Sequence, residues 1–441
     1  MLGNCSGGAV NQIELIAGLF AIVVVFGILA NWLKIAYPIL LVCGGLILSL
    51  HPWAPRFELP PEVVFLVFLP PLLYAAAFNT EWRAFRTQLR SISLLAIGLV
   101  LFTTAAVTAV CHYYLDLPWT VGFLIGAIIS PPDAVAAAAI TKRVRIPRIV
   151  STILEGESLV NDASALVAYR VAIGAVAYGG FVLAEAGWEF VVASVGGIAI
   201  GLLGAWSVIR VHRWLDRRQL ADTKLQIAIT LLTPFAVYLP AEHLHVSGVL
   251  ATVSAGLWVG TRCQQTFSRE FYGEARAVWE MLEFLLNGVI FILIGFQLPL
   301  ILESLSDDRS PEFLLTATLA LSAVVIVTRI VWVFPGAYLP RWLDRRLTGR
   351  GDPYPPWQSV TVVAWTGMRG VVSLAAAMAL PLKTETGAPF PHRDLIQFIT
   401  FWVIFATLVL QGLTLPLLIR ALGVDRFVEV ENESEAEERS C

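Results

Sequence analysis

The chain has 441 residues, of which 57% are hydrophobic and only 14% are charged. Soluble domains carry about 25% charged residues, so this composition excludes an ordinary soluble protein and predicts an integral membrane protein. The net charge of -3 provides no basic footprint for nucleic acid. The five cysteines show no CxxC or Cys/His spacing, which argues against a disulfide framework or a zinc site.

Apolar runs of about 20 residues, the length that crosses a hydrocarbon core, recur along the whole chain. They predict thirteen spans, at 12–33, 35–50, 60–79, 91–114, 119–140, 150–178, 188–209, 224–240, 246–261, 279–302, 313–338, 357–381 and 395–419. The expected fold class is an all-α polytopic membrane protein. Residues 1–428 would form the transmembrane domain, and residues 429–441 an acidic, disordered cytoplasmic tail.

The connections between these spans alternate in basicity. One set, taken with the C-terminal segment, holds 23 of the 30 Lys and Arg residues. The other set holds only Arg56, Arg309, Lys383 and Arg393. Because the basic side of a membrane protein is the cytoplasmic side, we expect a protein of the cell (inner) membrane with its N-terminus outside and its C-terminus in the cytoplasm.

Two of the predicted spans are interrupted near their middles. Pro131 and Pro132 remove two backbone donors from the fifth span. In the twelfth span, Gly367 and Gly370 flank Arg369. The breaks are seven spans apart, which predicts two inverted six-helix repeats, spans 1–6 and 8–13, with broken helices 5 and 12. Paired breaks of this kind mark a transporter's midplane site; the alternative is that Pro and Gly serve only close helix packing.

Carboxylates stand inside two consecutive apolar spans, Asp133 in the fifth and Asp162 in the sixth. An aspartate at the centre of a membrane helix is unfavourable by about 3 kcal/mol, so such acids are functional candidates. Ser158 lies four residues before Asp162 and shares its helix face, with Asn161 on the flank. Together with the carbonyls freed by the prolines, these groups make an all-oxygen site that suits a hard cation.

Two neighbouring carboxylates in a medium of low dielectric resist simultaneous ionisation, because burial and mutual repulsion both disfavour charge. A proton and a cation would therefore compete for the same oxygens. If only an occupied site crosses the membrane, this competition couples inward proton movement to outward cation movement. The alternative for such acids is a helix-end cap or a packed polar group, which is what we expect of Glu155, near the cytoplasmic end of its span.

Three ordered motifs, SPPDAVAA at 130–137, GESLVNDA at 156–163 and WTGMRGVVSLA at 365–375, resemble the cation/proton antiporter family. This family contains the bacterial and archaeal sodium/proton exchangers and the animal exchangers, and the resemblance covers essentially the whole chain. It implies thirteen spans in inverted repeats, a core domain that moves against a dimerisation domain, and a homodimer in the lipid bilayer. It also implies exchange of sodium, or another monovalent cation, for protons in pH homeostasis, with no cofactor.

The resemblance also assigns residues. The family's Asn-Asp pair matches Asn161 and Asp162, its fifth-helix aspartate matches Asp133, and its sixth-helix serine ligand matches Ser158. These four residues are the expected ion-binding residues, and a sodium ion would be held by Asp133, Ser158 and Asp162.

Three further residues would support the site. The family's glutamate before the serine matches Glu157, and Arg329 in the eleventh span has the place of its arginine partner. For Arg369, two roles are open: its charge could offset the negative C-terminal ends of the half-helices, or it could pair with a neighbouring acid.

Three positions depart from the pattern of many members. Asp133 is followed by Ala134 rather than by proline, and Ala75 stands where many members carry a third-helix acid. Asn161 stands where electrogenic relatives have a second aspartate. Because a neutral amide cannot carry a proton, we expect electroneutral exchange.

Two other functions would also use membrane aspartates. An intramembrane aspartyl protease carries Tyr-Asp and Gly-x-Gly-Asp motifs, and neither occurs in this chain. An ion channel would need a continuous pore, and saturating flux at low turnover would exclude it. We therefore expect a transporter and no enzymatic activity.

Overall fold

The computed structural model describes residues 5–51, 60–141, 144, 146–178, 183–220, 222–266, 269–305, 309–348, 353–384 and 387–424. Over the first half of the chain these form α1 (Cys5–Leu33), α2 (Tyr37–Ser49), α3 (Pro61–Val63), the π-helical η1 (Val64–Phe68), α4 (Leu69–Asn79), α5 (Trp82–Thr87), α6 (Leu89–Ser93), the π-helical η2 (Leu94–Leu99), α7 (Val100–Tyr113), α8 (Trp119–Ile129), α9 (Ala134–Thr141), α10 (Arg148–Tyr178) and α11 (Leu183–Arg217). The second half forms α12 (Thr223–His243), α13 (Gly248–Thr266), α14 (Arg269–Ser304), α15 (Pro311–Thr348), α16 (Trp357–Trp365), α17 (Val371–Met378) and α18 (Arg393–Leu422). The tail expected over 429–441 lies outside the described residues.

The described chain is helical throughout, and its only strand-like pairing is an isolated bridge between Lys383 and Pro389. Each of the thirteen predicted ranges coincides with one helix or with a run of consecutive helices. Seven described helices are long and apolar enough to cross a membrane. The all-helical membrane fold is therefore confirmed, while the count of thirteen spans and the inverted repeats stay predictions.

Both predicted interruptions are present. In the first, α8 ends at Ile129 and α9 begins at Ala134, because Pro131 and Pro132 cannot donate backbone hydrogen bonds. In the second, five residues separate α16 from α17. Two half-helices consequently replace one continuous helix at each break, which leaves backbone groups free to bind other partners.

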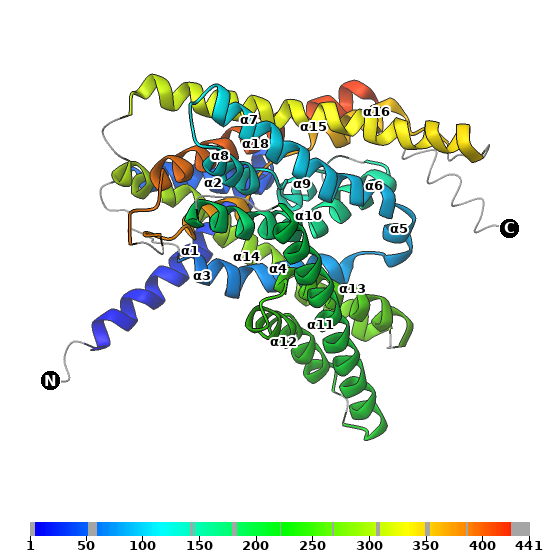
Figure 1. Ribbon diagram of the computed structural model, residues 1–441. Coiled ribbons are helices and arrows are strands. Elements are labelled where there is room, and N and C mark those ends of the chain that lie inside the picture. The colour runs from blue at the N-terminus through cyan, green and yellow to red at the C-terminus, as the bar shows by residue number, and fades with distance from the viewer. Residues whose placement is uncertain are drawn as a thin grey trace.

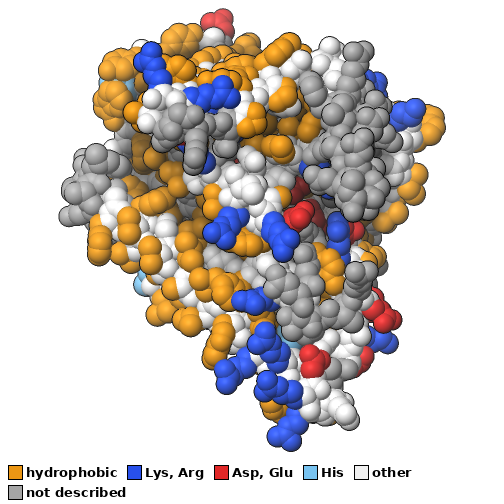
Figure 2. Space-filling view, turned by 90° about the vertical axis from the view of Figure 1, so that its right-hand side faces the viewer, with side chains coloured by type: hydrophobic (Ala, Val, Ile, Leu, Met, Phe, Trp, Pro, Cys, Tyr) orange, Lys and Arg blue, Asp and Glu red, His pale blue; other side chains and the backbone are white. Residues whose placement is uncertain are grey.

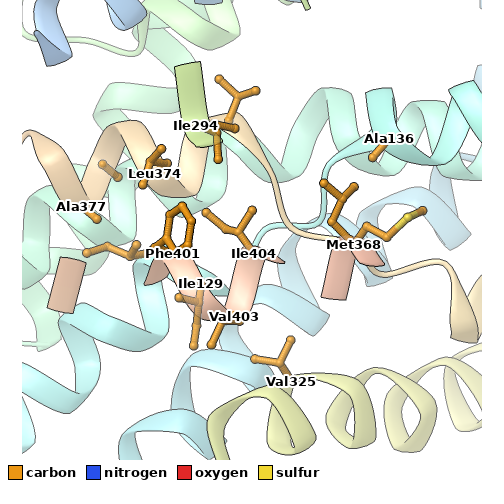
Figure 3. Close-up of a cluster of buried hydrophobic side chains, with 14 of the residues drawn as sticks. Ile129, Ala136, Ile294, Val325, Met368, Leu374, Ala377, Phe401, Val403 and Ile404 are labelled. Carbon is orange, nitrogen blue, oxygen red and sulfur yellow. The ribbon is translucent and has the colours of Figure 1, made fainter. Parts of the chain in front are cut away.

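The two breaks lie in the interior of the molecule. In Figure 1, α15 runs along one edge, α11 and α12 project from the opposite side, and α10 lies between them. Figure 3 shows Ile129 at the end of α8 gathered with Leu374 of α17 and with Phe401 and Ile404 of α18. These side chains are buried, so the packing of this apolar cluster holds the broken segments in place.

Candidate ion-binding site

The two breaks are joined by a backbone hydrogen bond. The amide of Asp133 donates to the carbonyl of Met368 at 2.7 Å. Asp133 also directly precedes α9, where its Oδ1 accepts a hydrogen bond from the amide of Val135 at 2.8 Å. A carboxylate at this position faces the positive end of a helix dipole, which favours the ionised form without supplying a full positive charge.

Two glycines of the second break permit the close approach of charged side chains. A Cβ atom at Gly370 would overlap the carboxylate of Asp133, and one at Gly367 would overlap Cδ of Arg329. The glycines that suggested a helix break in the sequence therefore also make room for Asp133 and Arg329 against the backbone.

Arg369 lies at the C-terminal end of α8. Its Nε donates to the carbonyl of Ile129 at 2.9 Å, and its Nη2 donates to that of Ser130 at 3.2 Å. Nη1 donates to the carbonyl of Gly367 within its own break. The side chain is fully buried, and among the described residues it forms no salt bridge. Its charge thus faces the negative ends of half-helices, while Asp133 occupies a positive end.

The helix α10 supplies the other predicted ion-binding residues. Nδ2 of Asn161 donates to the carbonyl of Pro132 at 3.1 Å, which ties α10 to the first break. Asp162 follows and is 8% exposed. Within the described chain, neither Asp133 nor Asp162 forms a salt bridge.

Glu157 has a different environment, although it is only five residues before Asp162. Its two carboxylate oxygens accept hydrogen bonds from Nη1 and Nη2 of Arg329 at 2.5 and 2.8 Å. Both side chains are buried, and Nε of Arg329 also donates to the carbonyl of Val363 at 3.1 Å. This two-pronged ion pair joins α10 to α15 and α16.

Asp133, Ser158 and Asp162 line one cavity of about 250 Å³. The same cavity is lined by Glu155, Arg276 and Glu280. Since these three side chains are exposed, the cavity connects the buried carboxylates to the surface.

Figure 2 shows a face of the molecule on which Lys and Arg side chains gather, with a few acidic side chains between them. Glu155 lies in the second turn of α10 rather than at a helix end, and its side chain lines the cavity. Of the two roles expected of Glu155, a helix-end cap does not fit this position, and the exposed side chain is part of the cavity lining.

Sequence reasoning missed four other polar residues that line the cavity: Asn79 of α4, Glu283 and Asn287 of α14, and Ser373 of α17. For Asn287 the available signal was a single amide inside the apolar run FLLNGVIFILIGF. An isolated amide does not indicate which neighbour it faces, because it belongs to no repeated motif and requires no partner of opposite charge.

The donor set limits the ions that the cavity could hold. No group of three or more His, Cys, Asp or Glu side chains in the described part of the chain could bind a metal ion. The predicted ligands Asp133, Asp162 and Ser158 supply two carboxylates and a neutral oxygen, which suit a hard cation of low charge. They are also groups that can exchange a cation for a proton.

The model of the sodium/hydrogen exchanger transmembrane family matches residues 19–421. The chain belongs to the sodium/hydrogen exchanger family. This exchanger is 37% identical over 433 residues to a Na⁺/H⁺ exchanger of Mycobacterium tuberculosis, an alignment that covers 97% of this chain and 77% of that protein. It is 34% identical over 390 residues to the sodium, potassium, lithium and rubidium/H⁺ antiporter of Bacillus subtilis, with 87% of this chain and 58% of that protein covered.

Among solved structures, the exchanger is similar to the sodium proton antiporter MjNhaP1 of Methanocaldococcus jannaschii at pH 8. The TM-score is 0.69 at 21% identity, over 94% of this chain and 99% of that one. The resemblance inferred from the three motifs is thus confirmed, and the family relatives are transporters rather than enzymes.

Proposed function

We propose that this exchanger is a secondary active transporter that moves sodium, or another monovalent cation, against protons, and that Asp133 and Asp162 form its alternating site. The observation that carries the proposal is the contrast among buried charges. Within the described residues, Glu157 and Arg329 pair with each other and Arg369 is bound to carbonyls. Among the described residues, Asp133 and Asp162 form no salt bridge, and both face a cavity that reaches the surface.

The chemistry follows from this lack of a partner. A buried carboxylate is strongly destabilised unless a positive charge accompanies it, so Asp162 requires either a bound cation or a proton. Ser158 lines the same cavity and would supply a neutral oxygen, while Asn161 holds the break in position through Pro132. Occupancy by one ion excludes the other, which couples their movements.

The two ends of α10 support alternating access. At one end the cavity opens between Glu155 and the Arg276–Glu280 pair, on the side that the basic connections predict to be cytoplasmic. At the other end, Nη2 of Arg170 contacts Oε2 of Glu242 at 2.7 Å and joins α10 to α12. We propose that this arrangement is the inward-open state, with the N-terminus outside and the C-terminus in the cytoplasm.

Electroneutral exchange is the stoichiometry that we propose. Asn161 has a neutral amide, Glu157 is paired with Arg329, and Ala75 is buried in an apolar cluster where other family members carry an acid. If Asp162 alone alternates between a proton and a cation, one positive charge crosses in each direction. A homodimer in the cell membrane that serves pH homeostasis completes the proposal on the strength of the family resemblance.

The main experiment measures ion-driven proton flux in proteoliposomes with sodium, lithium, potassium and rubidium in turn. We expect saturable flux with at least one of these ions and none with choline. A protein that conducts without saturation, or that moves no protons under any cation gradient, would overturn the proposed exchange.

A second experiment tests the stoichiometry. Sodium-driven proton flux is measured at several membrane potentials set with potassium and valinomycin, and the same potassium gradients without valinomycin serve as the control for potassium transport. Moving one net charge through 100 mV is worth about 2.3 kcal/mol, so an electrogenic cycle would respond strongly. We expect the same rate at every potential; a reversal point that moves with the potential would mean more than one proton per cation.

A further inference from the structure

Three neutral side chains that line the cavity have buried polar atoms without hydrogen-bond partners among the described residues. The side chain of Asn287 is fully buried, and neither its Oδ1 nor its Nδ2 has a hydrogen-bond partner among the described residues. Oδ1 of Asn79 and Oγ of Ser373 are also buried and have no hydrogen-bond partner among the described residues. All three residues line the cavity that contains Asp133 and Asp162.

Unpaired amides are unfavourable at this depth. A buried polar atom without a partner loses its hydration and gains nothing in exchange, and native proteins contain few such atoms unless an ion, a water molecule or a function accounts for them. Asparagine also has a low preference for helix interiors. Leucine at position 287 would serve packing and helix formation better, so a structural role does not explain Asn287.

The position of Asn287 and Asn79 relative to the acids is specific. The acids belong to the start of α9 and to α10, whereas Asn79 ends α4 and Asn287 lies in α14. Since α4 and α14 pack against each other, the two amides lie on a wall of the cavity that neither α9 nor α10 forms, and α14 brings Glu280 and Glu283 to the same cavity.

We infer that Asn287, with Asn79 beside it on this wall, binds the monovalent cation as it enters the cavity and so sets the exchanger's apparent affinity for cations. An amide oxygen is a neutral, hard ligand for a small cation. It cannot take up a proton in the physiological range, so it strengthens cation binding without adding a protonation site. This inference rests on the proposed function and deepens it.

The decisive variant is Asn287→Leu, and the readout is the KM for sodium measured at several pH values. In a competition between ions, loss of a cation ligand raises KM by the same factor at every pH, because proton binding is unchanged. We expect an increase of about tenfold, which corresponds to the loss of one charge-assisted contact. A change at a carboxylate would instead move the pH at which KM rises.

Thermal melting separates ligand binding from structural support. Without sodium, Asn287→Leu should melt at the same temperature as the unmodified protein or higher, because an unpaired amide has been removed. The rise in Tm on addition of sodium should shrink, since a ligand stabilises a protein according to its affinity. Gln297→Met is the matched control, because Gln297 is a buried amide on the same helix that does not line the cavity.

The outcomes distinguish this inference from the proposed function. If the unmodified protein exchanges ions and Asn287→Leu keeps its KM and its sodium-induced rise in Tm, the role of Asn287 is refuted and the exchange function stands. A lower Tm without sodium at unchanged KM would refute it in favour of a structural role. If the unmodified protein shows no cation-driven proton flux, the proposed function itself fails.

Discussion

The helix α10 carries two buried acids, Glu157 and Asp162, whose carboxylates have different surroundings. Glu157 is held by both nitrogens of the Arg329 fork, whereas Asp162, five residues later, has no described cationic partner and faces a cavity. A paired buried charge is a fixed part of the structure, because breaking the pair strands the other charge. An unpaired carboxylate that faces a cavity needs an external cation or proton, and the proposed exchange rests on this need.

The largest loss of transport is expected when a carboxylate that faces the cavity is neutralised, in Asp162→Asn and in Asp133→Asn. Each should reduce sodium-driven proton flux to background, because the amide binds neither a proton nor a cation as a carboxylate does. Neither variant should melt at a lower temperature, since an amide is easier to bury than a charge.

The check for both variants is proton flux in proteoliposomes alongside thermal melting of the purified protein. Asp116→Asn makes the same chemical change at an exposed site between α7 and α8 and should leave flux unaltered. Flux at the unmodified rate in either Asp162→Asn or Asp133→Asn would remove that residue from the site.

The reverse pattern is expected at the ion pair. Glu157→Gln leaves Arg329 buried without its counter-charge, and Arg329→Met does the same to Glu157; each should cost about 3–5 kcal/mol of stability. The double variant should recover part of the loss, because neither remaining side chain is a charge without a counter-charge. Melting temperatures of the two single variants and the double variant test this cycle. Normal melting of the single variants together with lost ion binding would place Glu157 in the ion site instead.

Some of this comparison could be predicted from the sequence and some could not. Asp133 and Asp162 were identifiable because charge inside an apolar span is unfavourable, and the breaks because Pro131 and Pro132 lack amide hydrogens. The pairing of Glu157 with Arg329 spans 172 positions, and only the family resemblance suggested it. No local pattern fixes which helices from distant parts of the chain pack together.

The sequence could not predict how deeply individual side chains are buried or which groups they face. The cavity exposes Glu155 but buries Asn287, although both lie in long helices of similar composition. Likewise, the two roles left open for Arg369 differ only in which acceptors its guanidinium reaches, and these acceptors are backbone carbonyls that carry no signal in the side-chain sequence. Length was also a poor guide to broken spans, because α8 has 11 residues and α9 only 8.

A smaller loss is expected for Arg369→Lys, which tests whether charge alone is enough at the breaks. Lysine keeps the positive charge but cannot reach three carbonyls with one planar fork. We expect a loss of about 1–3 kcal/mol, the usual effect of leaving a buried acceptor unpaired, together with slower exchange because Asp133 is bonded to the neighbouring Met368. Thermal melting and flux measure the two effects. Full stability in Arg369→Lys would show that only the charge matters, as it would if Arg369 served to offset an acid.

The smallest effect on stability is expected outside the spans, where Arg309 is hydrogen-bonded to a neutral histidine instead of a carboxylate. Nη2 of Arg309 donates to Nδ1 of His392 at 2.6 Å. Partial burial, and then the positive charge of Arg309, lower the pKa of His392 below its usual value. The folded protein therefore favours neutral His392, whereas the unfolded chain takes up a proton near pH 6.5. Stability from this contact is present above about pH 6.5 and is lost as the pH falls below it.

The variant His392→Asn tests this contact, because asparagine tolerates the left-handed backbone at this position, where φ is 53°. The fall in Tm between about pH 7.5 and about pH 5.5 should be slightly smaller in the variant than in the unmodified protein, because a partly exposed contact contributes less than about 1 kcal/mol to the free energy of unfolding. His245→Asn is the control, since His245 has the same backbone conformation and an exposed side chain. Identical pH dependence in His392→Asn and in the unmodified protein would mean that Arg309 does not hold His392 neutral, and that only the buried Arg329 pair contributes measurably to stability.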